Sequence, residues 1–148
     1  MTSRARRRPG AKSEYRLDDQ VGFLLRVAMQ RHTSIFMSQI IKGLTQTQFA
    51  ALAKLREVGP CSQNQLGRLI YLDAATTKGV VDRLEVRGFV TAHPDANDRR
   101  RRAIALTEGG RAVADAAVKI ARQITHQTLT PLSATEQRAV IRLLRKLA

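Results

Sequence analysis

The spacing of apolar residues changes at Gly88, and this change is the strongest constraint on the fold. Before Gly88, apolar residues recur every three to four positions, which is the period of an amphipathic helix. After it, the short runs "FVTAH" (89–93) and "AIAL" (103–106) have strand character. The intervening "PDANDRRRR" is rich in turn-forming residues. The sequence therefore predicts a series of helices followed by a β-hairpin with a long loop.

Capping residues divide the rest of the chain into helices. A long first helix is expected from Leu17 onward, with Gly43 as its stop. Side chains that can accept a hydrogen bond from a first helical turn predict the starts of the next helices, at Thr45, Ser62, Asp73, Thr107 and Ser133. The helix that begins at Asp73 is expected to end at Gly88 in a left-handed conformation.

Three short helices followed by a hairpin have the order of a winged helix-turn-helix. In that arrangement the third helix enters the DNA major groove and the hairpin, or wing, reaches the neighbouring minor groove. On the helix after Asp73, the expected buried stripe consists of Thr77, Val80, Val81 and Leu84. The opposite side carries the candidate DNA-contacting residues Ala75, Thr76, Lys78, Gly79 and Arg83. An ordinary amphipathic surface helix is the alternative interpretation.

Four consecutive arginines lie at the expected hairpin tip. If alternate residues point to opposite faces, Arg100 and Arg102 leave from one side and their two neighbours from the other. A nearby carboxylate, from Asp98 or also Asp95, would pair with one arginine and shape the loop. The candidate wing residues are Asp98, Arg99, Arg100, Arg101 and Arg102, and the candidate contacts to the DNA backbone are Ser62, Gln63 and Gln65. The narrow minor groove attracts arginine through its negative potential; a solvated charge run is the alternative.

The charge balance favours a polyanionic partner. The net charge is +14, of which the five cations among the first thirteen residues supply +5 and the remainder +9. Nucleic acid is the first expectation and an anionic membrane surface the second. Residues 1–16 are expected to form a disordered basic arm, and no apolar run approaches the roughly 18 residues of a membrane span. One cysteine, Cys61, fits a reducing cytoplasm.

The sequence offers little support for an enzyme. His32, His93 and His126 are widely separated, and no Cys/His spacing suits zinc. The segment "EGGR" (108–111) lacks the pattern of a phosphate-binding loop, and no nucleophile has a plausible base nearby. We therefore expect a binding protein that has neither a catalytic site nor a cofactor or metal.

The segment "DRRRRAIALTEGG" resembles the wing signature of MarR-type regulators. The resemblance extends upstream through "LTQTQFAALAKL" and "SQNQLGRLIYLDAATTKGVVDRLEVRGFV", and covers the chain from about Leu17 to Leu147. It implies a mainly α fold with a small hairpin, in a bacterial homodimer that binds a pseudo-palindromic operator. The implied DNA-binding lobe is 44–107, and 17–43 with 108–148 form the dimerisation helices. By the same resemblance Asp98 shapes the wing and Arg100 enters the minor groove, whereas Arg101 and Arg102 extend the usual arginine pair.

Family members commonly bind a small molecule between the dimerisation helices and the DNA-binding lobe. The candidate effector-binding residues on the first helix are Arg26, Arg31, His32 and Phe36. Their cations could meet the carboxylate of an aromatic acid or the phosphates of an acyl-coenzyme A. The resemblance favours such compounds as effectors that release a repressor. Alternatively, the arginines face solvent and His32 is an interface residue.

Two other functions remain open from the sequence. A thiol-based redox sensor could use Cys61, because a helix N-terminus can lower a thiol pKa, but the chain holds no second cysteine to resolve it. An architectural protein would coat DNA through charge alone and have no effector.

Overall fold

The computed structural model describes residues 14–148, so most of the expected basic arm (1–16) lies outside the described residues. The elements are a 3₁₀ turn Leu17–Asp19, α1 (Val21–Gln39), α2 (Gln46–Val58), β1 (Cys61–Ser62), α3 (Gln63–Leu69), α4 (Ala74–Val86), β2 (Val90–Pro94), β3 (Arg102–Leu106), α5 (Glu108–Leu129) and α6 (Ala134–Leu147). The expected mainly helical fold with a hairpin after three short helices is thus confirmed.

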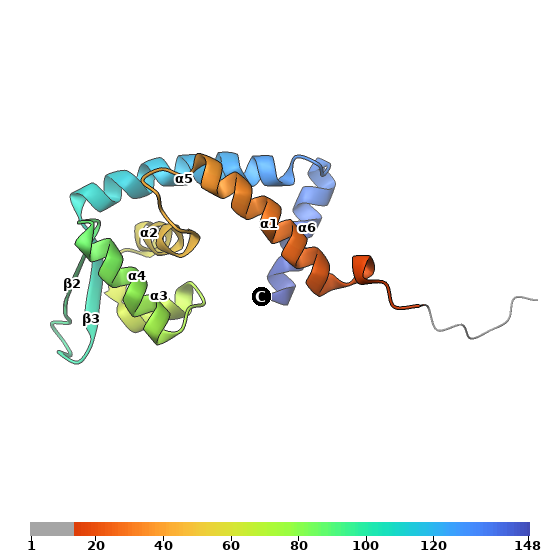
Figure 1. Ribbon diagram of the computed structural model, residues 1–148. Coiled ribbons are helices and arrows are strands. Elements are labelled where there is room, and N and C mark those ends of the chain that lie inside the picture. Colours follow the sequence, from red (N-terminus) through yellow and green to blue (C-terminus); the bar gives the residue numbers. More distant parts are fainter. Residues whose placement is uncertain (1–13) are drawn as a thin grey trace, which may run out of the picture.

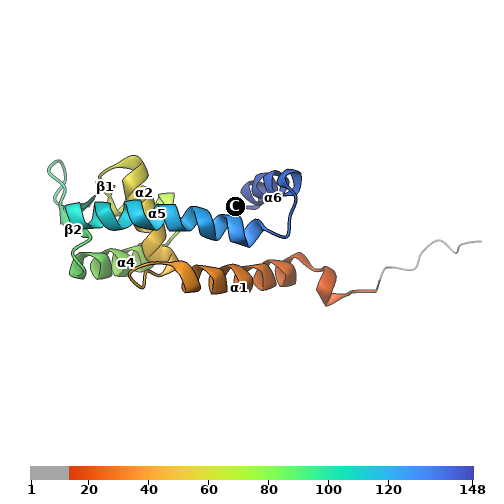
Figure 2. The same cartoon turned by 90° about the horizontal axis from the view of Figure 1, so that it is seen from above.

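The other elements are arranged along helix α5. It lies beside α1, as Figure 2 shows, while α2, α3, α4 and the sheet lie below its N-terminal half in Figure 1. Helix α6 turns away at the far end of α5, and Figure 2 shows it on the opposite side of α5 from the start of α1. The N-terminal half of α5 therefore packs on the small lobe formed by α2, α3, α4 and the sheet, and its C-terminal half extends beyond this lobe.

Capping explains where the helices start. Each of the expected cap side chains accepts a hydrogen bond from the third residue after it: Thr45, Ser62, Asp73, Thr107 and Ser133. At Thr45 the capping is reciprocal, since the Gln48 side chain also accepts from the Thr45 backbone N–H. Gly88 ends the α4 segment at φ +75°, a conformation that favours glycine.

The first helix starts later than expected. Residues Leu17–Asp19 form a separate 3₁₀ turn, and Gln20 has an extended backbone before α1 begins at Val21. The Gln20 side chain donates to the Arg16 carbonyl at 2.9 Å, and the Arg16 guanidinium lies 3.9 Å from the Asp19 carboxylate. These local contacts stabilise the turn in place of a continuous helix.

The antiparallel sheet has the strand order β1–β3–β2. Val90 pairs with Leu106 and Pro94 with Arg102, so the hairpin loop spans 95–101. The strand β1, which the sequence analysis missed, pairs Cys61 with Ile104. This third strand ties the wing to the entry of α3.

The core belongs to the small lobe and to the N-terminal half of α5. Its fully buried large side chains include Leu44, Leu52, Leu55, Leu66, Val81, Leu84 and Ile104. The interior face of α4 is Thr77, Val80, Val81 and Leu84, as the sequence predicts. In contrast, α6 has no buried residue, and it exposes Leu143, Leu144 and Leu147. Within residues 14–148, no helix combines the length and apolarity that crossing a membrane requires.

Candidate nucleic-acid interface

Helix α4 presents a polar, cationic face to solvent. Asp73 fixes its start, because the carboxylate accepts from the Thr76 backbone N–H at 2.7 Å. This hydrogen bond lowers the pKa of Asp73, so the cap is ionised at neutral pH. Thr77 is 1% exposed and its hydroxyl donates to the Asp73 carbonyl, which anchors the buried side. The predicted contact residues therefore lie outward: Ala75, Thr76, Lys78 and Arg83 are exposed and Gly79 is half-buried.

The wing loop is held by its own carboxylates. The Asp98 side chain accepts from the Arg100 backbone N–H at 3.0 Å and lies 3.6 Å from the Arg101 guanidinium. Asp95 accepts from the Asn97 backbone N–H at 2.9 Å. The backbone bond from Asp95 N–H to the Arg101 carbonyl closes the loop at 2.8 Å.

The expected alternation of the four arginines is wrong. Strand β3 begins only at Arg102, so Arg99, Arg100 and Arg101 lie in a turn, where neighbours do not alternate between two faces. These three arginines are exposed. Arg102 is half-buried and donates to Gln63 and Asp82. The wing therefore offers Arg99 and Arg100, with Arg101 beside Asp98, to an anionic partner.

The start of α3 lies beside both features. The Ser62 hydroxyl caps the helix by accepting from the Gln65 backbone N–H at 3.1 Å, and Gln65 itself is exposed. Gln63 and Asn64 line a small hollow of about 110 Å³ together with Arg100, Arg101 and Arg102. Of the predicted backbone-contacting residues, Gln63 thus borders the wing loop, and Ser62 pairs with Ala103 of β3.

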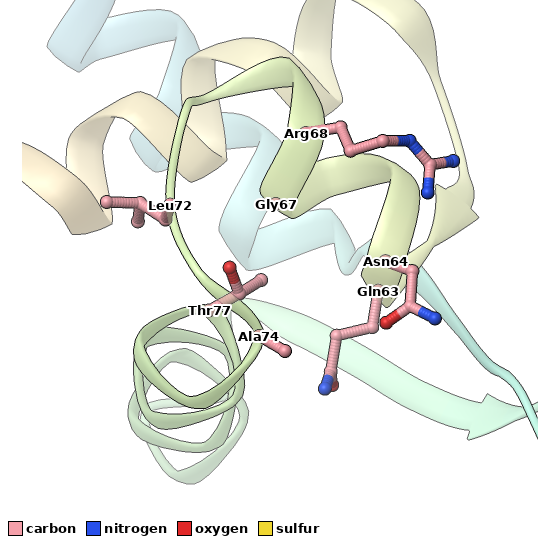
Figure 3. Close-up of a pocket in the computed structure, with 7 residues that line it drawn as sticks. All are labelled: Gln63, Asn64, Gly67, Arg68, Leu72, Ala74 and Thr77. Carbon is pink, nitrogen blue, oxygen red and sulfur yellow. The ribbon is translucent and has the colours of Figure 1, made fainter.

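A second hollow of about 320 Å³ separates α3 from the start of α4 (Figure 3). Gln63, Asn64, Gly67, Arg68, Leu72, Ala74 and Thr77 line it. The Gln63 side chain extends toward Ala74, and Asn64 and Arg68 extend from the same helix (Figure 3). Sequence reasoning missed Asn64 and Arg68 as candidate contacts; the signal was their polarity on a helix that has only a short apolar stripe.

The wing and α4 project to the same side. Figure 1 shows the hairpin loop and the N-terminal end of α4 extending away from α5. The exposed cations of this surface are Arg68, Lys78, Arg83, Arg99, Arg100 and Arg101. Lys78 also contacts Asp82 at 2.7 Å. A protruding helix beside a basic hairpin suits the adjacent grooves of a DNA duplex.

The predicted effector residues fall into two groups. His32 and Phe36 on α1 line a hollow of about 200 Å³, with Gln46, Phe49, Ala121, Ile124 and Thr125 from α2 and α5. Phe36 is 3% exposed, and its ring centroid lies 6.1 Å from that of Phe49. One ring nitrogen of His32 lies 2.8 Å from the Thr128 hydroxyl.

The two arginines do not line this hollow. Arg31 donates to the backbone carbonyls of Gln127 and Thr128 at the end of α5. Arg26 lies over the Phe23 ring, with its guanidinium carbon 5.3 Å from the ring centroid. Sequence reasoning missed Gln46, Phe49 and Thr125, because α2 and α5 meet α1 only in the folded chain.

Cys61 lies in β1 and is half-buried. Burial raises the pKa of its thiol, which reduces the fraction of reactive thiolate at neutral pH. Within residues 14–148, no group of three or more His, Cys, Asp or Glu side chains could hold a metal ion.

A short helix that braces a protruding helix, followed by a basic hairpin of a small antiparallel sheet, defines a winged helix-turn-helix protein. The chain belongs to the MarR family of transcriptional regulators, whose sequence profile matches residues 44–101. It is 44% identical over 140 residues to the HTH-type transcriptional repressor NicR of Pseudomonas putida. The match covers 94% of this chain and 89% of NicR. The resemblance noted in the sequence is therefore confirmed.

Solved structures show the same fold. A probable transcriptional regulator from Pseudomonas aeruginosa matches with a TM-score of 0.87 and 51% identity, over 90% of this chain and 100% of that chain. Bordetella bronchiseptica BpsR, whose DNA binding is regulated by 6-hydroxynicotinic acid, matches with a TM-score of 0.86 and 40% identity, over 91% of this chain and 97% of BpsR.

Proposed function

We propose that this regulator is a repressor that binds an operator in double-stranded DNA and is released by a small aromatic acid or its coenzyme A thioester. The observation that carries the DNA part is the projection of α4 and the wing from one side of the protein. Helix α4 lies in the major groove, where Thr76 can hydrogen-bond a base edge or contact a thymine methyl group. Arg100 enters the minor groove, held by the Asp98 turn.

The repressor acts as a homodimer. Exposed apolar side chains on α1 and α6 support this, among them Leu24, Leu25, Leu143, Leu144 and Leu147. Burying them against a second copy would assign 17–43 and 108–148 to dimerisation and 44–107 to DNA binding. A twofold dimer presents two α4 helices to half-sites about 10 bp apart, which means a pseudo-palindromic operator. Such a protein works where the chromosome lies, in the cytoplasm of a bacterial cell.

The effector binds in the hollow between α1, α2 and α5. Its apolar walls are Phe36 and Phe49, and His32, Gln46 and Thr125 supply polar groups. A volume of about 200 Å³ suits a single aromatic ring. The regulation of the similar BpsR by 6-hydroxynicotinic acid, an aromatic acid, supports this ligand class.

A thioester would need more room. Phe49, Ala121 and Thr125 also line an adjoining groove of about 470 Å³, whose charged lining residues are Arg56, Glu57 and Arg122. This groove could take the larger part of a coenzyme A thioester. Ligand contacts that span α1, α2 and α5 would couple the long helices to the DNA-binding lobe.

Titration of DNA by fluorescence anisotropy tests the DNA part. The protein is titrated against the DNA upstream of its own gene and against a random duplex at near-physiological salt. A preference of about a thousandfold or more is the result expected of a specific regulator. Equal and steeply salt-dependent affinities, on this DNA and on a genomic fragment library, would favour the architectural alternative.

The operator complex then tests the effector. Aromatic acids, beginning with 6-hydroxynicotinic acid, and coenzyme A thioesters are added at increasing concentration. Release by one of them is expected for the native chain and its Arg26→Ala variant, because Arg26 does not line the hollow. The variant His32→Ala should bind the operator but resist release. Release that is equal in all three proteins would place the effector elsewhere.

A further inference from the structure

The guanidinium of Arg102 faces the protein rather than solvent. One terminal nitrogen, Nη1, donates to Gln63 Oε1 at 2.9 Å and to Asp82 Oδ1 at 3.1 Å. The other, Nη2, lies 3.6 Å from Glu85 Oε1. Only 31% of the side chain is exposed. Two hydrogen-bond acceptors and a second carboxylate thus contact a cation that lies next to three exposed arginines.

These contacts join three elements that must keep a fixed relative position on DNA. Arg102 is the first residue of β3, Gln63 is the first residue of α3, and Asp82 and Glu85 belong to α4. The second Glu85 oxygen accepts from the Ala92 backbone N–H of β2 at 3.1 Å. Both strands of the wing are therefore connected to α4.

The position of Arg102 makes this connection effective. Arg102 pairs with Pro94 at the last rung of the hairpin, directly before the loop 95–101. The adjacent pair, Asp95 and Arg101, carries the backbone hydrogen bond, so Pro94 and Arg102 form a pair without a cross-strand backbone hydrogen bond. A side-chain tie at this rung therefore limits movement of the whole loop against α4.

The charges at this junction also indicate a role within the protein. Asp82 and Glu85 are acids on the helix that would face DNA, where they repel phosphate. The Asp82 carboxylate also contacts Lys78. Hydrogen bonds from Lys78 and, second in size, from Arg102 lower the pKa of this carboxyl group. The positive charge of Arg102 is thus balanced within the protein, unlike that of the exposed Arg99.

We infer that Arg102 is a positioning residue that sets the wing against α4 through Asp82, Glu85 and Gln63, and is not itself a DNA contact. The inference rests on the proposed DNA binding, and it departs from the sequence-based prediction that all four arginines contact DNA. Because α4 and the wing must enter adjacent grooves together, a loosened junction costs affinity for the operator more than for random duplex.

A matched pair of arginine variants tests the inference. Arg99→Met and Arg102→Met remove the same charge from residues three apart. Arg99→Met should weaken binding to operator and random duplex equally and lower the salt slope by about one. Arg102→Met should leave the salt slope unchanged and lower the ratio of operator to random affinity about tenfold. Identical behaviour of the two variants would overturn the inference.

Replacement of Asp82, an acidic partner of Arg102, gives a second test, in which charge and positioning predict opposite changes in operator affinity. Asp82→Asn makes the protein more cationic, so charge alone predicts tighter binding to every duplex. A positioning role predicts weaker operator binding, and the double variant Asp82→Asn/Arg102→Met should be no weaker than Arg102→Met alone. Tighter operator binding by Asp82→Asn, or additive losses in the double variant, would contradict the inference.

Hydrogen exchange on the DNA-free protein separates this inference from the proposed function. In Arg102→Met and Asp82→Asn, amides of residues 95–101 should exchange faster than in the native chain and in Arg99→Met, whereas core amides of α2 and α5 should not change. Unchanged exchange of the loop amides would contradict the positioning role of Arg102 even if DNA binding is confirmed. Faster exchange in the two variants, together with no operator preference in the native chain, would support the contact between Arg102 and α4 and refute the proposed function.

Discussion

Arg31 on α1 donates a hydrogen bond of 3.0 Å to the backbone carbonyl of Gln127, near the C-terminal end of α5. The same guanidinium also donates to the Thr128 carbonyl. Carbonyls of a last helical turn have no partner within the helix, and a cation there also interacts favourably with the helix dipole. Arg31 therefore connects two long helices through its guanidinium.

Replacement of Arg31 should lower stability. We expect Arg31→Ala to reduce the free energy of unfolding by about 1 kcal/mol or less, since these hydrogen bonds are exposed to solvent. Urea unfolding followed by circular dichroism measures the change. The control is Lys119→Ala, which removes an exposed cation from α5. If Arg31→Ala is as stable as this control, the tie between the helices contributes nothing.

Gly110 is required by a close backbone approach. A Cβ at this position would lie inside van der Waals contact with the carbonyl oxygen of Phe89, whereas a Cβ on the adjacent Gly109 would meet nothing nearer than 3.9 Å. Because the clash is with backbone, Gly110→Ala must shift α5 against the sheet, and we expect a loss of about 3 kcal/mol or more.

The neighbouring Gly109→Ala is the matched control. It should be neutral or stabilise the protein by up to about 1 kcal/mol, since alanine is the better helix former. Thermal unfolding of the two variants makes the comparison. A native-like Tm for Gly110→Ala would show that the start of α5 can move away from Phe89 without cost.

Acid should destabilise the folded chain through carboxyl groups whose pKa is lowered by native contacts. A hydrogen bond from Arg56, 2.5 Å away, lowers the pKa of Asp115, and capping of Thr76 lowers that of Asp73. The unfolded pKa of such groups is about 3.9. A depressed folded pKa stabilises the protein above that value, and the stabilisation disappears as the pH falls through the folded pKa.

The variant Asp115→Asn isolates one of these groups. At pH 7 it should unfold at a lower urea concentration than the native chain, and this difference should shrink below about pH 4. Urea titrations at pH 7, 5 and 3.5 measure both midpoints. A difference that is constant over this range would mean that Asp115 acts through packing and not through its charge.

Cys61 should not act as a redox switch. Burial raises the pKa of its thiol, so little thiolate is present at pH 7 for reaction with peroxide. We expect Cys61→Ser to bind DNA with native affinity, and hydrogen peroxide to leave both proteins bound. Release of the native protein alone by peroxide would establish the sensor function.

Local signals explain how much of the fold was predictable. The caps at Thr45, Ser62 and Asp73 depend on residues three positions apart, and each begins a helix where the sequence places it. The observed hairpin strands agree with the predicted ones to within one residue, because strand character is also a local signal. In contrast, β1 has only two residues and exists because Cys61 pairs with Ile104, which no local pattern reveals.

The site was predictable in composition but not in orientation. The exposed face of α4 follows from helical periodicity, so Thr76 and Lys78 lie outward as predicted. The orientation of Arg102 depends on Asp82 and Gln63, which tertiary packing brings to it from α4 and α3. Arg31 is a parallel case, because its acceptors lie at the far end of α5.

The division of labour between α4 and the wing is the central claim, and two variants measured on the same DNA test it most directly. The measurement is anisotropy titration of Thr76→Ala and Arg100→Ala against the operator, its single-base variants and a random duplex over a series of salt concentrations. Arg100→Ala should weaken binding to every duplex and lower the salt slope by about one. Thr76→Ala should keep the salt slope and lose discrimination at one base position, by about 1–3 kcal/mol. If the two variants change operator and random binding in the same way, the two-part recognition of DNA is contradicted.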